Sequence, residues 1–104
     1  MKVGDDSKIE AGAFIPEGVE IGRGVFIGPH VCFTNDLYPS ASDDNWKVTK
    51  TVIEDGASIG ANSTVLCGVT VGRNALVGCG SLVLRDVPAG MVYRGGGLFD
   101  RKRI

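Results

Sequence analysis

The chain has 104 residues, which is enough for one domain with a modest hydrophobic core. Its 11 basic and 12 acidic residues give a formal net charge of −1, so the composition predicts neither nucleic-acid binding nor attraction to an anionic membrane. No apolar run approaches the roughly 20 residues of a membrane span, and no signal-peptide core opens the chain. A cytoplasmic location without membrane association is therefore expected.

Apolar residues recur every six positions from the start of the chain. The first residues of these units are all apolar: Val3, Ile9, Ile15, Ile21, Ile27 and Phe33, then after a break Ile53, Ile59, Val65, Val71, Val77 and Val83. The fourth residue is Gly, Asn or Asp in every unit except the one that contains His30. Because these three residue types tolerate positive φ, each unit is predicted to be a short strand followed by a sharp corner.

A period of six fits neither an α-helix nor an ordinary array of hairpins. Short strands joined by corners of the same direction close by stacking each turn of the chain on the previous one. Three units per coil make a triangular prism, so the sequence predicts an all-β, single-stranded parallel β-helix of about four coils. Residues 1–92 are assigned to this domain, and residues 93–104 to an irregular tail that contains Arg101, Lys102 and Arg103.

The six-residue period fails between Phe33 and Ile53, which lie 20 positions apart. Residues 37–52 are therefore predicted to leave the prism as a loop, which includes Pro39 and the only tryptophan, Trp46. Loops on a rigid scaffold often carry function, so we expect a functional or intersubunit role for this loop. The alternative is a tolerated surface insertion.

The three cysteines, Cys32, Cys67 and Cys79, lack the spacing of a disulfide framework or of a zinc site. They are expected to be reduced and structural, and no metal site is predicted.

The units IGRGVFIGPHV and IGANSTVLCGVTVGRNALVGCGSLV, with FTNDLYP and LRDVPAG, resemble the hexapeptide-repeat acyltransferases. The combination of FTND, a loop and GANST is similar to the sugar-nucleotide N-acetyltransferases, which acetylate the 3-amino group of nucleotide-linked amino sugars. The resemblance implies a left-handed β-helix, a homotrimer with active sites between subunits, and acetyl-CoA as cosubstrate. It implies an N-acetyltransferase that acts on the amine of a small acceptor.

The same resemblance implies cofactor contacts at three positions. Ala61 and Cys79, one coil apart, would offer backbone N–H groups to the pantetheine arm of acetyl-CoA. Arg85 stands where the family often has Lys before Asp-Val-Pro, and it would donate to the cofactor phosphates.

His30 is the only histidine and the only exception to the corner rule. If the loop returns to the next corner in sequence, His30 stacks in one column with Gly12, Asn62 and Gly80, beside the expected cofactor path. Histidine exchanges protons near neutral pH, so the imidazole could accept the proton of an attacking amine. Histidine also visits positive φ more readily than most residues, so the alternative is that His30 is only a corner.

Asn35 and Asp36 match the Asn-Asp pair of the family, which would orient the acceptor amine. The alternative is that they only shape the turn into the loop. Because the amine is itself the nucleophile, the enzyme supplies mainly alignment and a polar site for the oxyanion.

Two departures from the family pattern leave a second reading open. Ser40 replaces the arginine that commonly follows Tyr-Pro, and only about two coils precede the loop, so the chain resembles a form shortened at its N-terminus. The second reading is a non-catalytic trimeric scaffold or binding module. A third, similar to the γ-class carbonic anhydrases, needs three histidines for zinc and is set aside because the chain has one.

Overall fold

The computed structural model describes residues 2–37, 39–41, 47–95 and 97–100. All regular elements in these ranges are short β-strands, which confirms the all-β class. The strands are β1 (Lys2–Val3), β2 (Lys8–Ile9), β3 (Val19–Ile21), β4 (Phe26–Ile27), β5 (Cys32–Phe33), β6 (Thr51–Ile53), β7 (Ser58–Ile59), β8 (Thr64–Val65), β9 (Thr70–Val71), β10 (Leu76–Val77), β11 (Leu82–Val83), β12 (Met91–Arg94) and β13 (Gly97–Asp100). Trp46 and the Arg101–Arg103 cluster lie outside the described residues.

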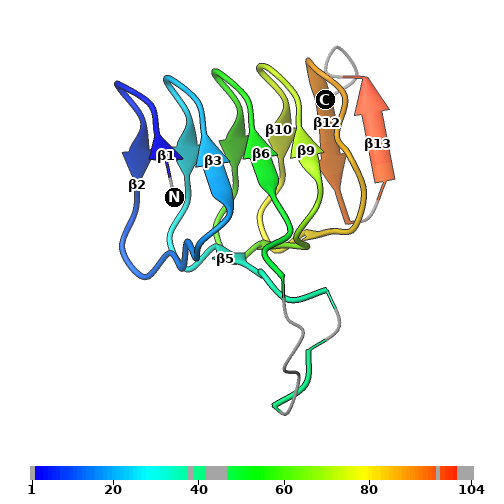
Figure 1. Cartoon of the computed structure of the whole chain (residues 1–104). Coiled ribbons are helices and arrows are strands. Elements are labelled where there is room, and N and C mark those ends of the chain that lie inside the picture. Colours follow the sequence, from blue (N-terminus) through cyan, green and yellow to red (C-terminus); the bar gives the residue numbers. More distant parts are fainter. Residues whose placement is uncertain (1, 38, 42–46, 96, 101–104) are drawn as a thin grey trace.

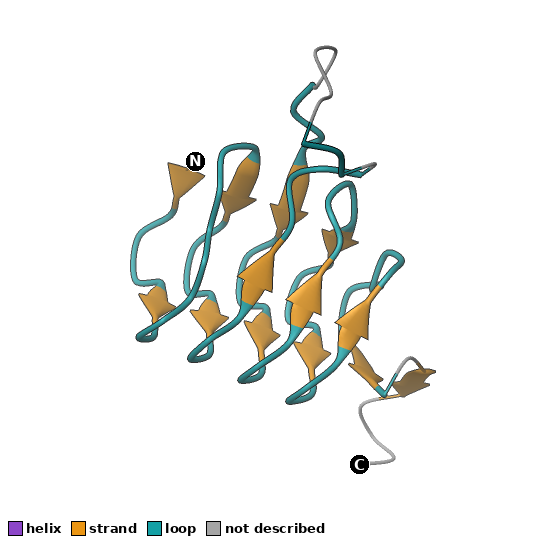
Figure 2. Cartoon of the chain, turned by 90° about the horizontal axis from the view of Figure 1, so that it is seen from below, coloured by secondary structure: helices purple, strands orange, loops and turns teal. Residues whose placement is uncertain are grey.

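The strands form three sheets, which are the three faces of a prism (Figures 1 and 2). Sheet A has the order β1-β3-β6-β9, sheet B has β13-β12-β10-β7-β4-β2, and sheet C has β11-β8-β5. Each strand pairs in parallel with its counterpart in the next coil, as Ile27 of β4 does with Ile59 of β7. The four strands of sheet A therefore mark four coils, as the sequence predicts.

The first residue of each six-residue unit fills the interior. Phe33, Ile53, Ile59 and Val65 are all 0% exposed. Successive side chains of a strand point to opposite faces, and in these short strands that alternation turns the β-branched position inward. Burial of this column of aliphatic side chains is the main force that holds the coils together.

The predicted corners also form in most units. A positive φ occurs at Asp6, Gly12, Gly18, Gly24, His30, Gly56, Asn62, Gly68, Asn74 and Gly80. Asp36 and Asp86, which the sequence places with them, lack it. Asp36 lies at the start of the loop, and Oδ1 of Asp86 instead accepts a hydrogen bond of 2.8 Å from the backbone N–H of Thr70.

The two ends of the prism differ. At the N-terminal end the inward side chains of Val3 and Ile9 are 43% and 40% exposed, because no further coil covers them within the described residues. At the C-terminal end Tyr93 is 2% exposed, and β13 pairs antiparallel with β12. The structure thus differs from the irregular tail expected from residue 93, because Gly95, with a φ of 58°, reverses the chain into a hairpin.

The loop lies between the end of β5 at Phe33 and the start of β6 at Thr51. It replaces the corner between sheets C and A in the second coil and projects away from the prism (Figure 1). The expected loop of residues 37–52 is thus found three residues earlier at its start, and its last two residues belong to β6. None of the described residues forms a helix that is long and apolar enough to cross a membrane.

Candidate active site

The corner between sheets B and C stacks equivalent residues of all four coils. Its fourth-place column consists of Gly12, His30, Asn62 and Gly80. The amides of His30, Asn62 and Gly80 donate to carbonyls of the preceding coil over 3.1, 3.0 and 2.8 Å. The loop therefore returns so that His30 stacks in this column, as the sequence predicts.

The imidazole of His30 lies against the bare backbone of Gly12. A Cβ at Gly12 would collide with Nδ1 and Cε1 of the ring and would lie 3.2 Å from Cγ. The φ of His30 is 59°, which is also the φ of Asn62 one coil later. His30 is therefore a corner residue whose ring is exposed to solvent and rests on glycine.

Ala61 and Cys79 precede this column in successive coils, and their amides are open. A Cβ at Gly28 would lie 2.7 Å from N of Ala61, and a Cβ at Gly60 would lie 2.6 Å from N of Cys79. Because glycine stands at both positions, no Cβ of the preceding coil crowds either nitrogen atom. Within the described ranges neither amide donates to another protein group. Two free donors thus lie one coil apart, about 4.8 Å along the prism axis.

At three positions in other corners, a side chain accepts a hydrogen bond from the corresponding amide. The pairs of donor amide and accepting side chain are Arg23 with Asp55 (2.9 Å), Arg73 with Glu54 (3.2 Å) and Cys67 with Thr34 (3.0 Å). An amide without such a partner depends on water or on a ligand. The corner between sheets B and C is therefore equipped for an extended ligand that carries hydrogen-bond acceptors.

A hollow of about 360 Å³ begins at the C-terminal end of this corner. It is lined by Gly80, Leu82, Leu84, Arg85, Tyr93 and Gly95. The Arg85 guanidinium carbon lies 5.8 Å from the centroid of the Tyr93 ring, whose hydroxyl donates to the carbonyl of Leu82 over 2.6 Å. Since Cys79 is the neighbour of Gly80, the structure brings the open amide of Cys79 and the cation of Arg85 to one continuous surface.

Asn35 and Asp36 lie beyond the C-terminal end of β5 in sheet C, whereas His30 lies before its N-terminal end. Strand β5 runs from the His30 corner to the start of the loop, and both residues follow it as half-buried side chains that have interaction partners. Within one chain the structure therefore brings His30, Ala61 and Cys79 together and holds Asn35 and Asp36 apart from them.

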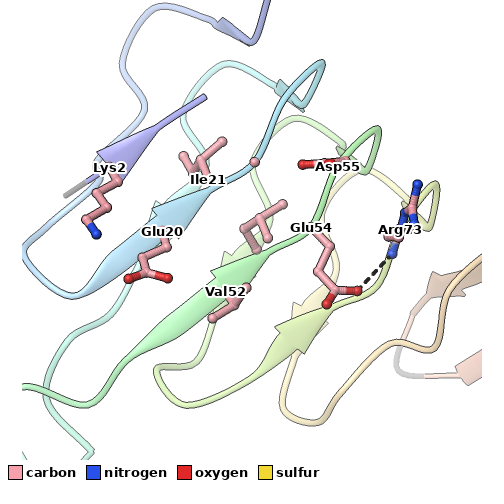
Figure 3. A pocket seen from close by; sticks show the side chains of 9 residues that line it. Lys2, Glu20, Ile21, Val52, Glu54, Asp55 and Arg73 are labelled. Atoms are coloured by element: carbon pink, nitrogen blue, oxygen red, sulfur yellow. Dashed lines mark hydrogen bonds between the residues drawn. The ribbon is translucent and has the colours of Figure 1, made fainter. Parts of the chain in front are cut away.

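A second hollow of about 360 Å³ lies on the outer face of sheet A (Figure 3). Lys2, Glu20, Glu54, Asp55 and Arg73 contribute its charged side chains. Glu54 and Asp55 are the carboxylates that close corner amides, and the Glu54 bond to Arg73 is drawn in Figure 3. None of the site residues predicted from the sequence lines this hollow, and we assign its two amide-binding carboxylates a structural role.

Two features of the site were not anticipated from the sequence. Gly28 and Gly60 place no Cβ against the two amides, although the repeated Ile-Gly pair was visible as a signal. Thr34 and Thr51 flank the loop, and their hydroxyls accept hydrogen bonds from the successive amides of Cys67 and Gly68, over 3.0 and 3.1 Å. Their signal was their position at the two ends of the break in the period.

The comparisons with known proteins identify the family and the fold of this chain. The model of the bacterial transferase hexapeptide family, with six repeats, matches residues 1–35 and 50–85. A hexapeptide-repeat acetyltransferase of Vibrio cholerae O1 biovar eltor, complexed with acetyl-coenzyme A, is 29% identical with a TM-score of 0.79. The match covers 92% of this chain and 56% of that one. No curated protein matches the sequence of this chain.

Two further solved structures are similar. A maltose O-acetyltransferase from Clostridium difficile 630 is 25% identical with a TM-score of 0.80, over 92% of this chain and 55% of that one. An N-acyltransferase from Bacillus cereus, in complex with dTDP and coenzyme A, has a TM-score of 0.66 over 97% of this chain and 74% of that one. Its 17% identity supports the fold alone.

This chain thus spans little more than half of the length of the first two proteins. The family model, in contrast, covers most of this chain and breaks where the loop leaves the prism. The prism is accordingly a left-handed parallel β-helix, and the chain belongs to the bacterial transferase hexapeptide family.

Proposed function

We propose that the chain is an acetyl-CoA-dependent acyltransferase that acetylates the amino group of a small acceptor. The observation that carries this proposal is the pair of open amides at Ala61 and Cys79, aligned along the prism beside His30. An extended pantetheine arm contains amide carbonyls that can accept from such a column of donors. The acetyl-CoA complex of the similar Vibrio cholerae protein supports the choice of cosubstrate.

The hollow at Arg85 suits the other end of the cosubstrate. A guanidinium presents several N–H donors in a planar fork that matches phosphate oxygens. The guanidinium lies within cation–π distance of the Tyr93 ring, at the rim of the hollow where a phosphate can approach it. The cosubstrate would then run from Arg85 along Cys79 and Ala61, with its thioester toward His30.

The chemistry that follows is direct acyl transfer. The acceptor nitrogen forms a bond to the acetyl carbon, and the carbon–sulfur bond breaks, so that the CoA thiolate leaves. His30 takes the proton that the nitrogen loses and returns it to the thiolate sulfur, which leaves the imidazole as it began. No covalent enzyme intermediate is needed, because alignment and oxyanion stabilisation supply the rate enhancement.

We assign Asn35 and Asp36 to orientation of the acceptor amine. They lie across sheet C from the His30 of their own chain, so a shared site needs the loop of a second copy. A homotrimer with sites between neighbouring prisms supplies that arrangement.

The acceptor is proposed to be a nucleotide-linked amino sugar, on the FTND and GANST motifs. Similarity to a maltose O-acetyltransferase makes a sugar hydroxyl the second acceptor to test. Turnover of acetyl-CoA with a dTDP-linked 3-amino sugar and with maltose distinguishes the two. Tight CoA binding without turnover of either would favour the scaffold reading.

The open amides can be tested by substitutions that remove only the N–H group. Pro29 already occupies the same corner position in the second coil, also after a glycine, so Ala61→Pro and Cys79→Pro fit the backbone there. Each lost hydrogen bond should weaken CoA binding by up to about tenfold in calorimetry.

Cys79→Ala is the matched control, because it removes the thiol and keeps the amide. It should bind CoA as the unmodified protein does. Unchanged affinity in both proline variants, with the β-helix intact by circular dichroism, would place the cosubstrate elsewhere.

A further inference from the structure

The two ends of the loop are gathered at one place on the prism. Thr34 directly follows β5 of sheet C, and its Oγ1 accepts a hydrogen bond of 3.0 Å from the backbone N–H of Cys67. Thr51 begins β6, and its Oγ1 accepts from the Gly68 amide over 3.1 Å. Since Cys67 and Gly68 are successive residues, the two threonine hydroxyls meet adjacent N–H groups of one corner.

The backbone of each threonine is fixed as well. The N–H of Thr34 donates to the carbonyl of Val65 over 3.0 Å, and that of Thr51 donates to the carbonyl of Gly18 over 2.9 Å. Thr51 is 0% exposed. Each end of the loop is therefore held at two points, one on the main chain and one on the side chain.

The returning arm of the loop fills the space that a corner residue would occupy. A Cβ built on Gly18 would lie 2.5 Å from Cγ1 of Val48, and a Cβ built on Gly68 would lie 3.3 Å from Cγ2 of Thr49. The arm is joined to sheet A by an ion pair of 3.0 Å between Lys50 and Glu20. The exposure of both charged side chains makes this pair a minor contribution.

We propose that Thr34 and Thr51 are positioning residues, which clamp the loop to the Cys67–Gly68 corner and thereby place Asn35 and Asp36 for acyl transfer. The proposal rests on the function proposed above for its catalytic consequence. Asn35 follows Thr34 directly, so the Thr34 hydroxyl fixes the first residue of the loop before the acceptor-orienting pair. The Thr51 hydroxyl fixes the return.

The test compares Thr34→Val and Thr51→Val with Thr34→Ser and Thr51→Ser. Valine keeps the shape and removes the acceptor oxygen, while serine keeps the oxygen. Thr70→Val, in β9 on the outer face of sheet A, is the matched control, because no hydrogen bond of its hydroxyl is found within the described ranges. Hydrogen exchange of residues 35–50 is measured in all five variants, and acetyl-CoA turnover is measured with the acceptor that the unmodified protein uses.

Both valine variants should exchange roughly fivefold faster in residues 35–50, with the serine and Thr70 variants unchanged. In turnover, kcat should fall about 10-fold to 100-fold, because small misplacements of orienting groups are costly, while KM for acetyl-CoA should stay constant. Recovery of kcat in the serine variants identifies the hydroxyl oxygen as the cause.

If residues 35–50 exchange at the same rate in both valine variants as in the unmodified protein, the proposal that the threonines clamp the loop is wrong. Should Thr51→Val fail to fold because its site is buried, Thr34→Val at the half-buried end decides the question. If the unmodified protein turns over no acceptor, the proposed function is wrong. The hydrogen-exchange comparison still tests whether the two threonines hold the loop.

Discussion

At the residue scale, the corner between sheets B and C is informative because it repeats. His30 and Asn62 both have a φ of 59°, so they occupy the same kind of corner. His30 differs from Asn62 in carrying an imidazole. Asparagine is among the residues that tolerate this conformation best. The chain therefore supplies its own control for separating the corner from the chemistry.

His30→Asn should keep the corner and lose the proton acceptor. We expect the free energy of unfolding to change by less than about 0.5 kcal/mol and kcat to fall by about 10² to 10⁴. Chemical denaturation and acetyl-CoA turnover measure the two quantities. Unchanged turnover would leave His30 as a corner residue only.

Gly12 and Gly24 form a second matched pair. Both have positive φ, at 79° and 62°, but a Cβ at Gly12 meets the His30 ring and one at Gly24 meets nothing within 4 Å. Both alanine variants should lose about 1 kcal/mol of stability from backbone strain. Only Gly12→Ala should also lower turnover, since the ring must swing away. Equal turnover of the two variants would show that the ring position is unimportant.

At the scale of the element, each coil is stabilised by the coils on either side of it. Ile59 of β7 lies between coils and is 0% exposed, whereas Ile9 of β2 in the first coil is 40% exposed. An isoleucine at this position therefore contributes more to the free energy of unfolding in an inner coil than in the first coil. The ends of such a stack are its least stable part, as in other repeat proteins.

Ile59→Ala and Ile9→Ala test this difference. We expect Ile59→Ala to cost about 2 to 5 kcal/mol, because it leaves a cavity that rigid neighbours cannot fill, and Ile9→Ala to cost less than half as much. Denaturant unfolding with comparable m-values in both variants gives the numbers. Equal losses would mean that the first coil is covered in solution.

At the scale of the whole molecule, the proposed site is incomplete within one chain. Sheet C separates His30 from Asn35 and Asp36, and side chains cannot span a sheet to meet one another. The proposed trimer resolves this, because the loop of one prism can reach the His30 corner of the next.

Mixed assemblies test the shared site. His30→Asn and Asp36→Asn should each be nearly inactive alone. Refolded together in equal amounts, they should regain about a quarter of the sites, since a site then draws an intact His30 and an intact Asp36 from different chains. Sedimentation of each variant checks that it assembles. No regain of turnover in mixed trimers would place all three residues in a site within one chain.

Sequence periodicity was sufficient for the architecture because the same local conformational preferences recur in each six-residue unit and stack in register from coil to coil. Inward β-branched residues and corner residues that accept positive φ recur without reference to distant parts of the chain, and the loop appears as a break in that rule. The irregular tail was wrong in part: residues 97–100 form β13, although Gly95-Gly96-Gly97 reads as irregular. The hairpin depends on the exposed edge of β12, which exists only once the prism is built.

The sequence by itself determined the parallel β-helix, its four coils, the loop and the column that contains His30, because these follow from local conformational preference and burial. Only the tertiary structure decided which amides stay open, that Arg85 lies against Tyr93 beside Gly80, and that two threonines separated by the loop bind successive amides. The physical reason is that a period of six specifies which residues share a face or corner. The hydrogen-bond partners across coils depend instead on how each turn is seated on the one before it.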